Sequence, residues 1–296
     1  GQFRAAGTNQ SVTYWELMSD ISLDVDVDEE VETKNPADYT SQNKPHIAKG
    51  MAEIMTGRYQ FLHDLKLENM LHARIIRPPH YHCELESLDS DVLSRLKQEN
   101  VYLVQDGSFL AVASLQEYQV VKAARRVSLA AKWKSVKQLS EENIYSQLTS
   151  NHRDSFFVEK GCIPSATRKI PELEQIDEDK NYKITATYRK PYHMHASIGP
   201  SAGCASFDGD GLMVWTHNQG VYPLRAAIIE AFDMPIDKVS VQFVPGAGVY
   251  GHNGADDAAF DAAIIARHIP GYPILLKWTR DDEHSWEPYG SAMQCE

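Results

Sequence analysis

The stretch Val241-Gln-Phe-Val-Pro-Gly-Ala-Gly-Val-Tyr-Gly-His-Asn-Gly-Ala-Asp-Asp257 joins a β-branched run, a Gly-rich loop and the start of an Ala-rich helical pattern. A Gly-rich loop between a strand and a helix brings backbone amides close to an anionic group at the helix N-terminus. The stretch therefore predicts an α/β unit that holds a cofactor, and the identity of that cofactor is the main question.

The spacing of Gly246, Gly248 and Gly251 matches the dinucleotide fingerprint Gly-x-Gly-x-x-Gly. That fingerprint also needs an acidic residue about 20 positions further on, at the end of the next strand. Position 271 is a glycine, and the acidic cluster at residues 281–283 comes about ten positions late. The match is incomplete, so a Rossmann-type nucleotide-dependent dehydrogenase stays an alternative only.

The elements on either side of this stretch predict an α+β fold. Strands alternate with helices from residue 212 onward, which favours some parallel pairing. An Asp-Gly turn at Asp106 predicts a hairpin earlier in the chain. The expected strands are 58–61, 71–77, 101–105, 109–113, 182–188, 212–216, 239–244 and 274–278, and the expected helices are 90–99, 115–132, 223–232 and 256–269.

Changes in composition predict four segments. Residues 1–45 are polar and form a linker and the end of a preceding segment, with a short helical turn over 11–18 behind a Ser or Thr cap. Residues 46–135 form an α+β domain, residues 136–180 a charged connecting segment, and residues 181–296 a second α/β domain.

Composition limits the function classes. The 296 residues are 43% apolar and 24% charged, with a formal charge of −12, as in a soluble globular protein. Seven acids between Asp20 and Glu32 are typical of a solvated strand edge or linker, and an acidic chain without a basic stripe argues against nucleic-acid binding.

No apolar stretch approaches the roughly 20 residues of a membrane span. The four cysteines form no Cys-x-x-Cys pair, which argues against an iron–sulfur cluster or structural zinc within this chain. Nothing in the sequence decides between a cytoplasmic and a periplasmic location.

Two loops that follow predicted strands carry the candidate site, namely residues 215–220 and 246–254. Ligands of open α/β sheets lie outside the carboxyl ends of the strands, so we expect both loops to face one crevice. Gln219 can both donate and accept hydrogen bonds there, and the amides near Tyr250 and Gly251 can bind an oxyanion. Gln219 could instead cap its helix.

Other polar residues have simpler interpretations. Asp256 and Asp257 lie in a helix first turn, where the macrodipole stabilises a carboxylate by roughly 0.3–1 kcal/mol. His193 and His195 alternate along a strand and could form a zinc pair, but no third ligand follows at a recognisable spacing.

The order and spacing of several segments resemble the molybdopterin-binding subunit of the xanthine dehydrogenase/aldehyde oxidase family, in particular the isoquinoline 1-oxidoreductase β-subunit type. Residues 70–79, Met-Leu-His-Ala-Arg-Ile-Ile-Arg-Pro-Pro, resemble the family's α/β hammerhead domain. The similarity covers nearly the whole chain, through residues 192–200, 214–220, 224–225, the Gly-rich loop, 277–283 and 286–290. It implies a hammerhead domain over 46–135, followed by the first part of a molybdenum-cofactor-binding α/β domain over 181–296.

The resemblance implies a chemistry. A molybdenum ion held by a pterin dithiolene hydroxylates a carbon of an aldehyde or an N-heterocycle with oxygen from water. Electrons leave through an iron–sulfur subunit and a cytochrome or flavin partner. Gln219 matches the family glutamine near an oxo ligand of the metal, and Tyr250-Gly251 match the pair whose backbone approaches the molybdenum. The implied cofactor-binding residues are Gln219, Gly248, Tyr250, Gly251, His252 and Asn253, and no side chain is expected to ligate the metal.

The sequence departs from the family at two points. Members that act on purines often carry a glutamate just after the Gly-rich loop, where this chain has His252-Asn253, so a purine substrate is not expected. The glutamate that serves as general base has no match in these 296 residues. We therefore expect a central piece of the subunit that is inactive alone and open to loss of its cofactor. A non-catalytic scaffold that keeps the family fold is the other alternative.

Overall fold

The computed structural model describes residues 2–19, 26, 30, 32–40, 42, 44–137, 143–150 and 184–295. It separates into two compact units, Gly1–Gly57 and Arg58–Glu296. Most of the acidic run at 20–32, most of the connecting segment at 136–180 and Cys162 lie outside the described residues.

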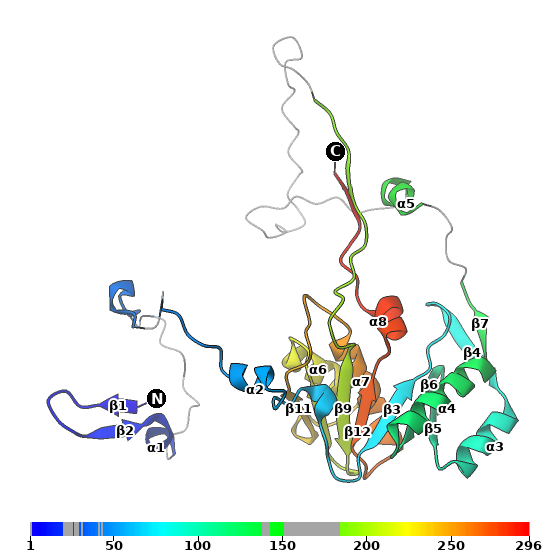
Figure 1. Ribbon diagram of the computed structural model, residues 1–296, viewed down its shortest axis with the longest axis horizontal. Helices are drawn as coiled ribbons and strands as arrows, with labels where there is room; N and C mark the ends of the chain where they lie inside the picture. Colours follow the sequence, from blue (N-terminus) through cyan, green and yellow to red (C-terminus); the bar gives the residue numbers. More distant parts are fainter. Residues whose placement is uncertain are drawn as a thin grey trace. The chain divides into compact units, whose positions relative to one another are not determined.

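The first unit is built from short elements. Its β1 (Gln2–Arg4) and β2 (Ser11–Thr13) form an antiparallel hairpin that leads into α1 (Tyr14–Met18), all dark blue in Figure 1. The Thr13 hydroxyl accepts from the Glu16 amide at 3.1 Å, and the Glu16 carboxylate accepts from the Thr13 amide at 2.8 Å. This capping box starts the helix and confirms the predicted turn behind a Ser or Thr cap. A 3-10 turn η1 (Pro36–Asp38) and α2 (Met51–Met55) follow.

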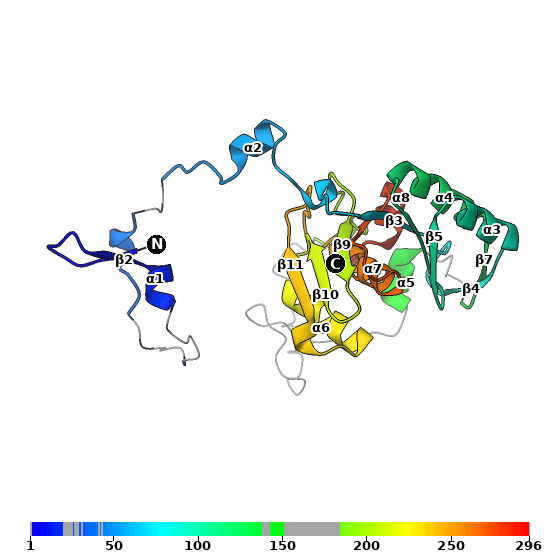
Figure 2. The same cartoon turned by 90° about the horizontal axis from the view of Figure 1, so that it is seen from below.

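A seven-stranded mixed sheet organises the second unit, with the order β11-β10-β9-β12-β3-β6-β5. The pairs β10–β11 and β12–β3 are parallel, whereas β9 is antiparallel to both of its neighbours. Figure 2 shows β11, β10 and β9 side by side. The strands are β3 (Leu71–Ile75), β5 (Tyr102–Asp106), β6 (Phe109–Ser114), β9 (Ala202–Phe207), β10 (Leu212–Thr216), β11 (Val239–Phe243) and β12 (Ile274–Lys277).

Helices cover the two faces of this sheet. The helix α7 (Ala255–His268) packs on β9, β12 and β10, and α6 (Val221–Phe232) packs on β11. On β6, Ala111 and Ala113 join the core formed with α7, while Leu110 and Val112 join a second core with α3 (Ser90–Gln98) and α4 (Glu117–Ala130). Successive side chains of a strand point to opposite faces, so α7 and the α3–α4 pair lie on opposite sides of the sheet.

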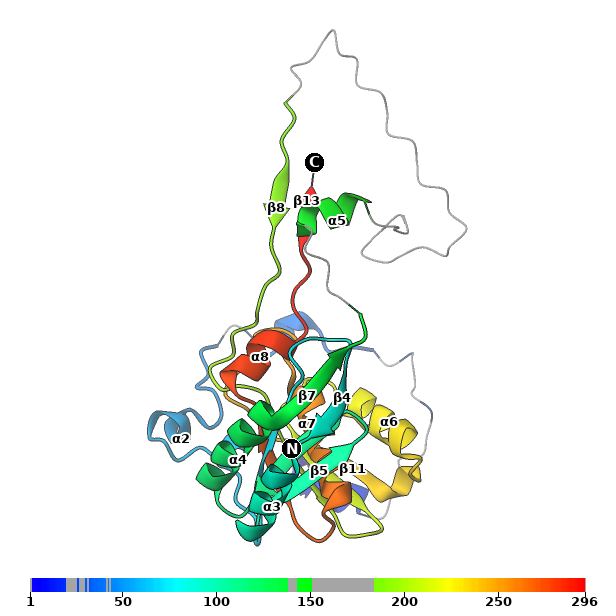
Figure 3. The ribbon, with the colours of Figure 1, turned by 90° about the vertical axis from the view of Figure 1, so that its right-hand side faces the viewer.

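Shorter elements complete the second unit. The strand β4 (Cys83–Leu88) pairs with β7 (Ala131–Ser135), and β8 (Tyr188–Lys190) pairs with β13 (Met293–Cys295) in a ladder that runs away from the sheet in Figure 3. Between β12 and β13 lies α8 (Arg280–Trp286), capped by Thr279. The remaining elements are η2 (Leu62–Asp64), η3 (Ile236–Lys238) and α5 (Ile144–Ser150).

Most predicted elements between residues 71 and 137 and after residue 210 are confirmed. The hairpin across the Asp-Gly turn is β5–β6, and the helices around the Gly-rich loop are α6 and α7. Two strand predictions differ from the structure: residues 58–61 form no strand, and in 184–188, the described part of the predicted strand 182–188, only Tyr188 enters one. The strands β1, β2, β4, β7, β9 and β13 were not predicted.

One sheet carries strands from both predicted domains. The parallel pairing of β12 with β3 joins residues 46–135 to residues 181–296 within a single ladder. Buried residues from β3, β6 and β9–β12 also share one hydrophobic core with α7. The mixed α/β character is thus observed, and the division at residues 135 and 181 stays a prediction. None of the helices in the described ranges has the length and apolar character of a membrane span.

Candidate functional site

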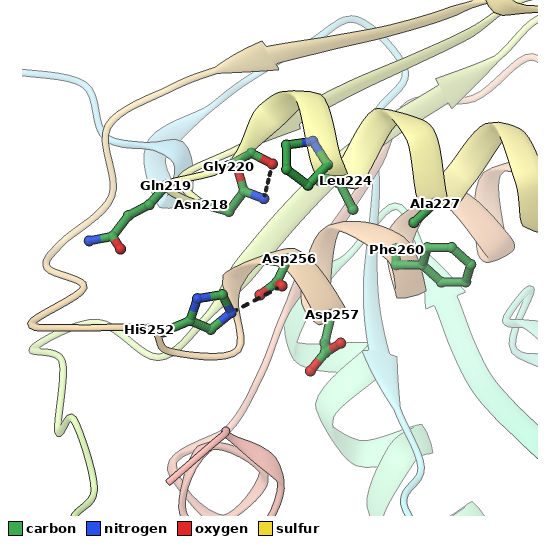
Figure 4. Close-up of a pocket in the computed structure, with 10 residues that line it drawn as sticks. Asn218, Gln219, Gly220, Leu224, Ala227, His252, Asp256, Asp257 and Phe260 are labelled. Carbon is green, nitrogen blue, oxygen red and sulfur yellow. Dashed lines mark hydrogen bonds and ion pairs between the residues drawn. The ribbon is translucent and has the colours of Figure 1, made fainter. Parts of the chain in front are cut away.

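Two loops meet at one edge of the sheet. Because β10 and β11 are parallel, their carboxyl ends lie side by side, and the loops that follow lead into α6 and α7. A pocket of about 510 Å³ lies between these loops and the first two turns of both helices (Figure 4). It is lined by Asn218, Gln219, Gly220, Pro223, Leu224, Ala227, His252, Asp256, Asp257 and Phe260. The predicted crevice outside the strand ends is present, and Gln219 and His252 both line it.

The polar groups of the pocket are mainly hydrogen-bond acceptors. The Asn218 side chain donates through Nδ2 to the Gly220 carbonyl at 3.2 Å, while its buried Oδ1 has no hydrogen-bond partner among the described residues. An unsatisfied buried acceptor is costly, so Oδ1 is a candidate contact for a ligand N–H. The Gln219 side chain is exposed at the pocket rim.

Two carboxylates give the pocket a negative character. His252 Nε2 lies 3.2 Å from Asp256 Oδ2, four residues along the chain. Burial is the main cause that raises the pKa of Asp257, and the negative charge of Asp256 raises it further. Both aspartates lie in the first turn of α7, as expected from the sequence, and both also line the pocket. Their charges make this pocket unsuited to a phosphate group.

Three positions of the Gly-rich loop must be glycine because aromatic rings pack directly against their Cα atoms. A Cβ on Gly246 would lie 2.5 Å from the His217 ring, one on Gly251 2.4 Å from the His195 ring, and one on Gly254 2.4 Å from the Trp278 ring. These distances exclude any larger residue unless the rings move. The sequence suggested bare amides for an anion, whereas the structure shows that these glycines are needed for packing inside the protein.

The remaining predicted residues of the loop have distinct places. Gly248 and Tyr250 adopt φ values of 112° and 54°, in the region that favours glycine. The Tyr250 side chain is exposed, and Asn253 is buried with Oδ1 accepting from the Ala255 amide at 3.3 Å. Within this loop, His252 alone among the predicted cofactor-binding residues lines the pocket. The roles of Gly248, Tyr250, Gly251 and Asn253 stay predictions.

A buried histidine supports the base of the loop. His217 Nε2 accepts from the Ala202 amide at 3.1 Å, and desolvation lowers the pKa of His217 to about 4, with the nearby His63 adding to the shift. The rings of His63 and His217 are 5.7 Å apart. The Leu62 amide donates to the Pro245 carbonyl at 2.8 Å, so this segment holds the strand-to-loop junction in place. Sequence reasoning passed over His217, although it lies two residues before Gln219.

A second pocket of about 230 Å³ adjoins the first and shares Asp257 and Phe260 with it. Arg77 lies 4.8 Å above the Trp278 ring and 5.2 Å above the Trp286 ring, and its Nη2 is 2.7 Å from Asp261 Oδ2. Burial raises the pKa of Asp261 to about 6 in spite of that cation. No periodic signal in the sequence marks this cluster, because its members come from four separate parts of the chain, after β3, in α7, after β12 and at the end of α8.

The predicted alternatives find little support in the geometry. In the dinucleotide fold, the strands on either side of the Gly-rich loop and its helix are neighbours. Here β11 and β12 are separated by β10 and β9. For the zinc pair, the described residues contain no group of three or more His, Cys, Asp or Glu placed to hold a metal ion.

Comparison with known proteins identifies relatives. The chain is 27% identical to a nicotinate dehydrogenase subunit of Pseudomonas putida over 98% of its own length and 24% of that protein. It is 22% identical to a probable xanthine dehydrogenase subunit of Bacillus subtilis over 81% of its length and 35% of that protein. A segment covering 38% of the chain, and 16% of the other protein, is 28% identical to the aldehyde oxidoreductase molybdenum-binding subunit PaoC of Escherichia coli. No family model matches the chain.

The chain is related to the molybdenum-binding subunits of the xanthine dehydrogenase and aldehyde oxidase family. Two solved structures share its fold. Quinoline 2-oxidoreductase from Pseudomonas putida 86 superposes with a TM-score of 0.57 at 13% identity, over 83% of this chain and 36% of that one. The aldehyde oxidoreductase from Desulfovibrio gigas gives a TM-score of 0.56 at 13% identity, over 82% of this chain and 31% of that one. The chain spans about a quarter to a third of the length of the family members that it matches along most of its length.

Proposed function

We propose that this chain forms part of the cofactor-binding portion of a molybdenum hydroxylase that oxidises an aldehyde or an N-heterocycle with oxygen from water. The observation that carries the proposal is the pocket at the carboxyl ends of β10 and β11, where Gln219 and His252 lie on facing loops. Relatives named as nicotinate dehydrogenase, aldehyde oxidoreductase and xanthine dehydrogenase subunits support the substrate class.

The polar groups that line the pocket fit part of a molybdopterin cofactor. A pterin ring carries N–H groups, and Asn218 Oδ1, the Gln219 amide and the Asp256 carboxylate are acceptors that can bind such groups. The two carboxylates favour the pterin over the phosphate end of the cofactor, which we assign to residues outside this pocket. When bound, the cofactor would supply the molybdenum centre at which the substrate is oxidised.

Gln219 is the residue that we propose to act closest to the chemistry. Its amide is exposed at the rim, where it can donate a hydrogen bond to a metal-oxo oxygen. We further propose that backbone groups of Gly248, Tyr250 and Gly251 approach the cofactor, with His252 and Asn253 holding the end of the loop. The left-handed conformation of Tyr250 supports a special role for this backbone.

The domain assignment follows the same resemblance. We propose that residues 46–135 correspond to the hammerhead domain, 136–180 to a connecting segment and 181–296 to the first part of the molybdenum domain. The fold that most of the chain shares with quinoline 2-oxidoreductase and with an aldehyde oxidoreductase supports a relationship of this kind, and the bounds follow from the sequence resemblance. We also propose that an iron–sulfur subunit and a cytochrome or flavin subunit accept the electrons.

The proposal is tested on the natural gene product, purified with whatever subunits accompany it. We expect about one molybdenum per subunit by elemental mass spectrometry and acceptor-dependent oxidation of aldehydes or N-heterocycles. The 296 residues alone should show no turnover, since they span only part of the relatives. A natural protein that contains no molybdenum would overturn the proposal in favour of a scaffold, and nicotinamide binding at micromolar concentration would favour a dehydrogenase.

A further inference from the structure

The His195 imidazole connects a buried carboxylate to the Gly-rich loop. Its Nε2 accepts a hydrogen bond from the His252 backbone amide at 3.1 Å. On the other side, Glu287 Oε1 lies 3.6 Å from His195 Nδ1 and accepts from the His195 backbone amide at 2.7 Å. The ring therefore lies between Glu287, the residue that follows α8, and the Gly-rich loop that lines the candidate pocket.

These contacts decide which ring nitrogen carries the proton. A nitrogen that accepts from an amide must present a lone pair, so Nε2 of His195 is unprotonated. The proton of the neutral ring is then on Nδ1, which makes no hydrogen bond among the described residues and has Glu287 Oε1 3.6 Å away. The Glu287 side chain is fully buried, so water screens its contact with the ring little. It also interacts with the side chain of Glu283, whose pKa is raised by burial.

The same ring also contacts the loop by packing. A Cβ on Gly251 would lie 2.4 Å from His195 Cδ2, so the ring fills the space that the glycine leaves open. Two consecutive residues of the loop, Gly251 and His252, are thus held by one side chain. His252 is the loop residue that enters the pocket and contacts Asp256 there.

We propose that Glu287 and His195 are positioning residues: the carboxylate holds the proton of His195 on Nδ1, and Nε2 then fixes the loop at the His252 amide. The consequence for the cofactor rests on the proposed function, since the loop is the part of the chain that we assign to the molybdenum centre. The tautomer and the order of the loop do not rest on it. Neither residue touches the reacting atoms.

Two substitutions separate positioning from simple packing. Glu287→Gln keeps the shape and can keep an oxygen at the position of Oε1, which accepts from the His195 amide and lies nearest Nδ1, but it removes the carboxylate charge that holds the ring proton on Nδ1. His195→Phe keeps a ring against Gly251 and removes the acceptor for the His252 amide. Matched controls are Glu230→Gln and His193→Phe, both at exposed positions.

The first measurement is amide hydrogen exchange of the peptide that covers residues 248–254, in the full chain. Loss of one hydrogen bond predicts about fivefold faster exchange at His252 in both variants and no change in the controls. The second is the imidazole ¹⁵N spectrum of the unmodified protein, which should show a protonated Nδ1 on His195. Exchange that stays within twofold of the parent in both variants, or a protonated Nε2 in the parent, overturns the proposal.

Molybdenum content of the natural enzyme carrying Glu287→Gln then tests the link to the cofactor. We expect at least a twofold lower content than in the Glu230→Gln control. Faster loop exchange with unchanged molybdenum would overturn the link to the cofactor while the positioning of the loop stands. An unmodified enzyme without molybdenum would overturn the proposed function and leave the exchange result unaffected.

Discussion

Arg77 and Asp261 form an ion pair across 184 residues of sequence, with Arg77 Nη2 2.7 Å from Asp261 Oδ2. Arg77 follows β3 in the predicted hammerhead region, and Asp261 lies within α7 of the second predicted domain. Trp278 contributes its Nε1 to the same carboxylate oxygen at 3.3 Å, and its ring lies beneath the guanidinium. The pair thus connects the two predicted domains beside the candidate pocket.

Arg77→Met is expected to lower the free energy of unfolding by about 3 kcal/mol at pH 7.5, since it leaves a buried carboxylate without its cation. At pH 5.0 the loss should be smaller, because the Asp261 carboxyl takes up a proton and no longer needs that cation. Urea unfolding at the two pH values measures both quantities.

The control for this substitution is Arg74→Met on β3. Arg74 pairs with Glu117, whose side chain is 39% exposed, and a pair of this kind contributes at most about 1 kcal/mol. Equal losses for the two variants, or a larger loss for Arg77→Met at pH 5.0 than at pH 7.5, would contradict the prediction.

His217 is expected to make the protein less stable in acid. Its folded pKa of about 4 lies below the ordinary value of 6.5 because burial disfavours the charged ring. As the pH falls from 6.5 to 4, the unfolded chain binds a proton that the folded chain does not. The free energy of unfolding should therefore fall by about 3 kcal/mol over this range through His217.

Asp261 contributes in the opposite direction, since its raised pKa favours the folded state as the pH falls. The effect of His217 is therefore measured as the difference between the parent and His217→Gln in urea unfolding from pH 4 to pH 7. His193→Gln, at an exposed position, is the control. A difference that does not change with pH would show that His217 titrates normally.

The strands and helices around the Gly-rich loop could be predicted because each carries its own periodicity. The strand β9 was missed because its sequence, Ala-Gly-Cys-Ala-Ser-Phe, has no β-branched residue and no alternation. This strand lies in the middle of the sheet, and its small residues make room for α7. Burial on both faces removes the alternation on which sequence reasoning depends.

The candidate pocket was predictable as a space between two loops at one edge of the sheet, and the residues that support its loops were not. Gln219 and His252 could be placed together because parallel strands align their carboxyl ends. The contacts of His195 with Glu287, and of β12 with β3, join residues about 90 and 200 positions apart in the chain. No local pattern encodes such pairings, since they follow from the packing of the whole sheet.

Gln219→Ala should separate function from stability. The side chain is exposed, so its removal is expected to change the free energy of unfolding by no more than about 0.5 kcal/mol. If Gln219 donates to a metal-oxo oxygen, kcat of the assembled natural enzyme should fall about 100-fold. Gln242→Ala, at an exposed glutamine on β11, is the control. Unchanged kcat in Gln219→Ala would remove this residue from the proposed site.

Gly203 marks the closest approach of β9 to α7. A Cβ at this position would lie 2.4 Å from Ala259 Cα and 2.6 Å from the Ala258 carbonyl oxygen, both of which are backbone atoms. Backbone cannot rotate away as a side chain can, so Gly203→Ala must push the helix from the sheet. Overpacking of this kind costs about 1–3 kcal/mol, and we expect a value near the upper end.

The matched control is Gly211→Ala, where a Cβ would meet no atom nearer than 3.7 Å. This substitution should change the free energy of unfolding by less than about 0.5 kcal/mol. Because α7 begins at the Gly-rich loop, Gly203→Ala should also speed amide exchange in residues 248–254, which Gly211→Ala should leave unchanged. A stable Gly203→Ala protein with unaltered exchange would show that α7 is not held against β9 as closely as the structure places it.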